Sequence, residues 1–125
     1  MRQKRERPSS WVAPSFEVIP MASRRNLQQV LINNASSGNL TVFTNPSSTA
    51  FAYVWAISVS VAGTANLTFK DSFGNLTGAM SFTATEGYSG VDNGVAPWFA
   101  IGPSQSFIIN DSAGVQKSGF CNWSN

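Results

Sequence analysis

The chain has 125 residues, enough for one domain, and only 11% of them are charged, with a formal net charge of +2. It contains no histidine and a single cysteine, Cys121, which excludes an internal disulfide and a zinc site built from cysteine and histidine. No run approaches the roughly 18 apolar residues of a membrane span, and no apolar segment follows the basic start, so we expect neither a membrane segment nor an export signal. The unpaired Cys121 suits synthesis in a reducing cytoplasm, and we expect it to be a buried hydrophobic residue.

Residues 1–25 differ in composition from the rest of the chain. They hold six basic residues against Glu6 and Glu17, whereas residues 26–125 hold two lysines against four acidic residues. Three prolines and the lack of any periodicity predict an extended arm. A tail that is fully exposed to water has no use for large apolar side chains, and this arm contains several. We therefore expect the arm to dock on a protein surface. The residues that we expect to make the contact are Arg2, Lys4, Arg5, Arg7, Trp11, Phe16, Arg24 and Arg25.

Residues 26–125 predict a single β-domain. Weak alternation indicates strands near 27–33 and 39–44. The clearest pattern covers Phe51 to Val61, where large apolar residues occupy the odd positions and mostly small residues lie between them. Such a period of two is typical of a strand with one buried face. We therefore expect the odd positions, from Phe51 and Tyr53 through Val61, to face the core.

Two turn signals predict two hairpins further along the chain. Asp71 to Asn75 separates an alternating run at 66–70, with Leu67 and Phe69 facing inward, from another at 79–85. A similar signal from Asp111 to Gly114 separates 107–109 from 115–123. Between these hairpins, the glycine-rich stretch 86–95 indicates a surface loop, and 96–101 indicates a short strand.

About eight short strands without a convincing helix predict an antiparallel β-sandwich. We favour a jelly-roll-like arrangement, with an immunoglobulin-like sandwich as the alternative. The low charge leaves two interpretations of the surface: a neutral surface rich in serine and threonine, or one that is covered by partner subunits.

The composition gives little support for an enzymatic function. Glu86 and Asp92 flank the predicted loop and could form a carboxylate pair, or bind calcium together with Asn93, but solvated loop acids are far commoner. The glycine-rich patterns that bind phosphate are missing. We therefore expect no enzyme activity, no metal site and no cofactor.

Two binding roles remain open. Tyr88 and Trp98 flank the predicted loop and could stack on a sugar, although we favour Trp98 as a core residue at the start of a strand. The basic arm could contact nucleic acid, but its few charges and the acidic body make nucleic acid a less favoured partner than protein.

Several segments resemble small β-sandwich virion proteins of tailed bacteriophages. The resemblance covers about residues 50–125 and rests on WAISVSV (55–61), ANLTFKD (65–71), GAMSF (78–82), PWF (97–99), SFII (106–109) and GFCNW (119–123). It implies a structural role, as a head decoration (cement) protein or as a fibre or tail component, with no catalytic residues.

The long basic arm departs from the simplest pattern of these proteins and suits a decoration protein. The resemblance then implies a protein made in the host cytoplasm that lies on the outer capsid surface. Its arm would reach the major capsid protein or the other copies in a homotrimer. The alternatives are a glycan- or receptor-binding tail or fibre module, and a minor capsid protein whose arm contacts the genome.

Overall fold

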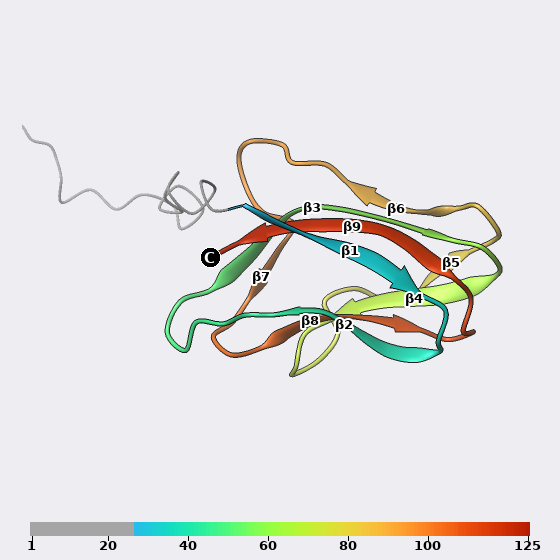
Figure 1. Ribbon diagram of the computed structural model, residues 1–125, viewed down its shortest axis with the longest axis horizontal. Helices are drawn as coiled ribbons and strands as arrows, with labels where there is room; N and C mark the ends of the chain where they lie inside the picture. The colour runs from blue at the N-terminus through green and yellow to red at the C-terminus, as the bar shows by residue number, and fades with distance from the viewer. Residues whose placement is uncertain (1–26) are drawn as a thin grey trace, which may run out of the picture.

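The computed structural model describes residues 27–125, which form nine antiparallel strands and no helix. One sheet has the order β1-β9-β3-β6, with β7 also paired to β3, and the other has the order β2-β8-β4-β5. Figure 1 shows the two sheets packed face to face. The strands are β1 (Gln28–Asn34), β2 (Gly38–Thr44), β3 (Ala52–Val61), β4 (Ala65–Lys70), β5 (Met80–Phe82), β6 (Gly87–Gly90), β7 (Phe99–Ile101), β8 (Ser106–Asp111) and β9 (Lys117–Ser124).

The strand order identifies the sandwich as a jelly roll. Strands from the two ends of the domain interleave, because β9 lies between β1 and β3 while β8 lies between β2 and β4. This nesting is of the jelly-roll type, with β7 as a fifth strand in the first sheet, and it differs from the strand order of immunoglobulin domains. The predicted jelly-roll-like sandwich is therefore confirmed, and the strand order does not follow the immunoglobulin alternative.

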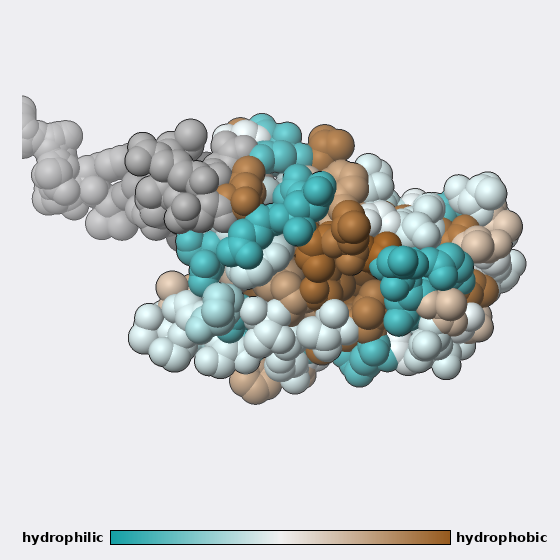
Figure 2. Space-filling view, viewed as in Figure 1, coloured by the Kyte–Doolittle hydropathy of each residue, from teal (hydrophilic) through white to brown (hydrophobic). Residues whose placement is uncertain are grey.

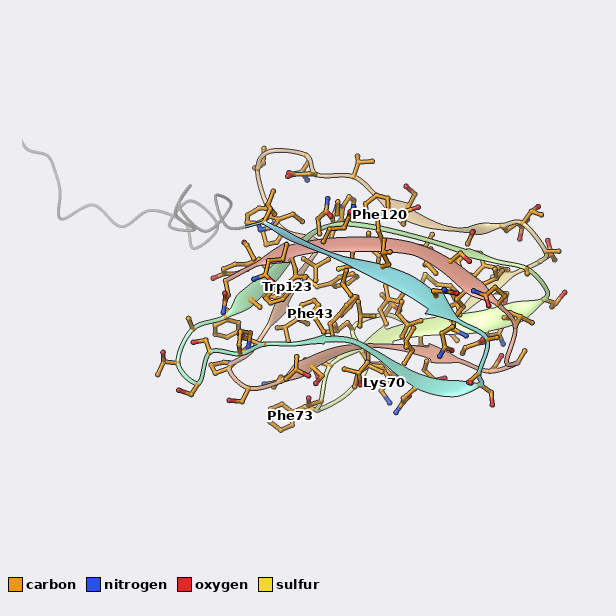
Figure 3. The ribbon with its side chains drawn as sticks, in the orientation of Figure 1. Phe43, Lys70, Phe73, Phe120 and Trp123 are labelled. Carbon is orange, nitrogen blue, oxygen red and sulfur yellow. The ribbon has the colours of Figure 1, made fainter. Side chains whose placement is uncertain are left out.

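Aromatic side chains join the two sheets through the core. Phe43 on β2 stacks on Trp123 on β9, with ring centroids 4.2 Å apart and planes 3° from parallel (Figure 3). Phe69 on β4 is fully buried, and its ring meets the rings of Tyr88 on β6 and Phe99 on β7 edge to face, at centroid distances of 5.0 and 5.7 Å. Because burial of each large side chain contributes about 1.5–3 kcal/mol, these rings contribute strongly to the contact between the sheets.

The strand predicted at 51–61 is present as β3, but two of its predicted inward positions, Phe51 and Tyr53, are not buried. The pairing of β3 with β9 shifts register between Val54 and Ala56, which is a β-bulge with Trp55 as the extra residue. An extra residue reverses the alternation, so Val54 is buried while Phe51 is 49% exposed. Tyr53, beside Val54, lies on the opposite face from the core. From Trp55 onward, the predicted positions Trp55, Ile57, Val59 and Val61 are all buried.

The first predicted hairpin is confirmed and the second is wrong. Strands β4 and β5 pair, and the Asp71 carboxylate accepts hydrogen bonds from the backbone of Phe73 and Gly74 in the turn between them. Strands β8 and β9 do not pair, because they belong to opposite sheets. The turn at Asp111–Gly114 is therefore a crossover between the two layers.

Part of the glycine-rich stretch predicted as a loop is a strand. Strand β6 pairs with the second half of β3. A Cβ atom at Gly87 would overlap the carbonyl oxygen of Val59 on β3, so only glycine permits this approach of the two backbones. The glycines of this stretch therefore mark a close contact between two strands as well as the loop that follows β6.

A buried ion pair holds the crossover between β8 and β9. Lys117 Nζ lies 2.6 Å from Asp111 Oδ2, and both side chains are fully buried. The same Nζ donates hydrogen bonds to the carbonyl oxygens of Ser36, 3.0 Å away in the β1–β2 turn, and of Val115. Burial alone would raise the pKa of Asp111, but the hydrogen bonds from Lys117, Ala113 and Val115 outweigh it and hold this pKa below its ordinary value.

Candidate interaction surface

The residues predicted to make the arm contact, from Arg2 to Arg25, lie outside the described residues. The structure therefore places none of them, and their predicted docking role stays a prediction. The candidate surface is built from residues 27–125 alone.

The two aromatic residues predicted for glycan binding have different surroundings. Tyr88 lies on β6, and its ring meets the buried ring of Phe69 edge-on at 5.0 Å, so it packs against the core. Trp98 is 42% exposed, its indole nitrogen donates a hydrogen bond to the carbonyl oxygen of Val91, and its ring packs against Gly90. Tyr88 is thus partly buried against the core while Trp98 keeps an exposed surface, and their glycan-binding role stays a prediction.

The acidic residues proposed for catalysis or calcium binding support local turns. Glu86 accepts a hydrogen bond from the backbone nitrogen of Thr83, which lowers its pKa, and Asp92 accepts one from that of Gly94. The four extended residues of β6 separate Glu86 from Asp92 by more than about 13 Å along the strand, beyond the spacing of glycosidase pairs. Residues 27–125 contain no group of three or more His, Cys, Asp or Glu residues that could hold a metal ion.

Cys121 is fully buried on β9, as the sequence predicted. Burial raises the pKa of its thiol to about 12, because the surrounding core disfavours the charged thiolate. The thiol is thus protonated at neutral pH and has little nucleophilic character.

Among the described residues, the outer face of the first sheet carries no Asp, Glu, Lys or Arg side chain, and we call it the uncharged face. The register of β1, β9, β3 and β6 defines it as Gln29, Leu31 and Asn33, Ser118, Phe120 and Asn122, Ala56, Ser58 and Ser60, and Gly87 and Ser89. In the described domain, Lys117 and Asp111 are buried, and the other four charged residues lie off this face, at the end of β4 and in the segments on either side of β6.

An apolar pair lies at the centre of the uncharged face. Leu31 is 75% exposed and lies directly beside Phe120 in the register of β1 and β9. Figure 3 shows Phe120 pointing away from the sandwich interior that holds Phe43 and Trp123. Serine and uncharged amide side chains surround the pair, so another protein surface could approach closely without desolvating a charge.

The outer face of the second sheet has a different character. Its polar side chains bond to one another across the strands, as Asn110 does to Asn39 at 2.7 Å and Ser81 does to Asn66 at 2.8 Å. It also has one charged residue, Lys70, near the exposed ring of Phe73 at the β4–β5 turn (Figure 3). The uncharged face is therefore the better candidate for contact with another protein.

Comparisons with known proteins found no relative of this chain. No family model matches the chain, and neither the curated proteins nor the solved structures contain a match. The described residues include no helix that is long and apolar enough to cross a membrane.

Proposed function

We propose that this chain is a non-enzymatic structural protein of a virus particle, of the capsid decoration type. It would lie on the outer capsid surface and stabilise the head by bridging neighbouring major capsid subunits. The observation that carries this proposal is the uncharged face, a broad neutral sheet surface with exposed Leu31 beside Phe120 at its centre. A sheet face without charge suits permanent contact with protein better than free exposure to water.

The state of the reactive groups supports a binding role. The four acidic side chains of the described domain accept hydrogen bonds within turns or from Lys117. The Cys121 thiol is buried and protonated. Acid–base and nucleophilic catalysis need groups that are free to exchange protons with a substrate, and these groups are already used to hold the fold.

The charge distribution supports a role for the arm in the same contact. Residues 1–25 carry a net positive charge, whereas residues 26–125 are net negative. Twenty-five residues can span at most about 80–90 Å, which is enough to pass from one capsid subunit to the next. The arm would supply reach and charge, while the jelly roll would supply a rigid neutral surface.

Removing residues 1–25 tests this proposal. We expect residues 26–125 to keep the circular dichroism of a β-sandwich but to lose co-sedimentation with purified heads. Two full-length variants separate the contributions: one replaces Arg2, Lys4, Arg5 and Arg7 with glutamine, and the other replaces Trp11 and Phe16 with serine. Equal binding of the truncated and full-length proteins would overturn the role of the arm. Binding of the arm to DNA at about 150 mM salt would instead favour the genome-contacting alternative.

A further inference from the structure

Within residues 27–125, strand β1 is an end strand of the first sheet and its own residues include none of the usual devices that protect a sheet edge. Within the described residues it pairs only with β9, so alternate backbone groups along its other edge have no strand partner. Natural edge strands are commonly protected by a charged residue, a proline or a bulge. The seven residues from Gln28 to Asn34 include none of these, and their pairing with β9 runs without a register shift.

The chemistry of β1 is symmetric about its central residue, Leu31. A β-branched residue lies on each side of Leu31, and two amide residues follow at each end, giving the order QQ-V-L-I-NN. Figure 2 shows this pattern as a hydrophobic centre between two hydrophilic ends along the line of β1. When two such strands pair antiparallel with Leu31 opposite Leu31, every residue faces one of its own class.

The same pairing continues the surfaces that the sheet already has. On the uncharged face, Leu31 lies beside Phe120, so pairing would create an unbroken apolar row of Phe120, Leu31, Leu31 and Phe120 across the two copies. On the inner face, the partly buried Val30 would meet Ile32 of the second copy and extend the core. At the ends, the Asn33 amide is already oriented by a hydrogen bond from Gln116 and would face Gln29 of the second copy.

We infer that two copies of this chain associate through β1, about a twofold axis that passes between their two Leu31 residues. Their first sheets then form one continuous sheet across the dimer. A twofold contact uses the same edge on both copies, so it closes after two and does not propagate into fibres. This contact does not depend on the proposed capsid role. It differs from the homotrimer expected from the resemblance, and the two assemblies have different masses.

Cysteine cross-linking tests the register of this contact. Residues directly opposite in an antiparallel pair have Cα atoms about 4.5–5.5 Å apart, which is within disulfide range. Under a mild oxidant, Leu31→Cys should therefore form a covalent dimer in high yield. Gln29→Cys should not, because its two copies would lie about 13 Å apart, whereas a mixture of Gln29→Cys and Asn33→Cys should cross-link. The buried native thiol gives no product in the unmodified protein.

Light scattering on the full chain provides the second test. We expect a mass twice the 13.4 kDa of the monomer at high micromolar concentration. Leu31→Lys places like charges directly opposite each other and should weaken the dimer by more than about tenfold. Phe73→Lys makes the same kind of change at a site that is 86% exposed and off β1, and should leave the dimer intact. A monomeric or trimeric mass for the full chain, or cross-linking of Gln29→Cys as efficient as that of Leu31→Cys, overturns the inference.

Discussion

Replacing Lys117 with methionine is expected to lower the free energy of unfolding by about 3–5 kcal/mol, because it leaves the Asp111 carboxylate buried without its charged partner. The loss is a large part of the roughly 5–15 kcal/mol that stabilises a typical domain. Methionine keeps most of the volume of the lysine side chain, so the effect would come from charge and hydrogen bonding. Chemical denaturation of the full chain, followed by tryptophan fluorescence, measures it.

Matched variants separate the buried ion pair from a general effect of losing a lysine. Lys70→Met, at the surface end of β4, should change the stability by less than about 0.5 kcal/mol. The double variant Lys117→Met/Asp111→Leu should recover part of the loss, because no buried charge remains, although the backbone nitrogens of Ala113 and Val115 lose their acceptor. Equal effects at Lys117 and Lys70 would contradict a structural role for the pair.

The pH dependence of these variants has a defined sign. The folded-state pKa of Asp111 lies below its unfolded value, so the stability it contributes is present above the unfolded value and is lost as pH falls through the folded value. In Lys117→Met, loss of the cation raises the folded-state pKa of Asp111 relative to the native protein, so the variant loses less stability than the native protein as pH falls. The difference in stability between the native protein and the variant should therefore narrow as pH falls.

Replacing Phe69 with alanine is the second change with a large expected effect, about 3–5 kcal/mol of lost stability. Phe69 is fully buried, and its ring contacts the rings of Tyr88, Phe99 and Phe107 at centroid distances of 5.0, 5.7 and 5.8 Å. Truncation would open a cavity between the two sheets that these neighbours cannot close. The shift of the denaturation midpoint at constant slope measures the loss.

Phe73 provides the matched control for Phe69, because it is the same residue type four positions along the chain and is 86% exposed. Phe73→Ala should leave stability within about 0.5 kcal/mol of the native protein. If Phe69→Ala were equally mild, the core described for this sandwich would not be the one that stabilises it.

The alternation of apolar residues predicted most of the fold. The predictions that were wrong have local structural causes. The period of two located β4 and β5 correctly, but it could not reveal the bulge at Trp55, because an inserted residue leaves the local composition unchanged. The turn at Asp111–Gly114 has the same residues as a hairpin turn, and only long-range packing decides that it joins opposite sheets. Lys117 and Asp111 do share the inward parity of Cys121 and Ile109, and this was the available signal for a buried pair.

The candidate surface was harder to predict than the fold. Sequence patterns singled out Tyr88 and Trp98 because they are aromatic and flank a loop, but the structure packs Tyr88 against Phe69. The sequence does not distinguish Leu31 from its apolar neighbours Val30 and Ile32. Alternation predicts which face of a strand is buried, but it does not show whether the strand lies at the edge of a sheet. That knowledge requires the sheet order, which places β1 at an end beside β9.

A three-dimensional reconstruction of the virus particle, assembled with and without this chain, tests the central proposal most directly. The proposal predicts additional density of jelly-roll size on the outer surface of the head, over the contacts between major capsid subunits, with a thinner connection extending onto a neighbouring subunit. Additional density confined to the tail or fibres, or located inside the shell against the genome, would contradict it.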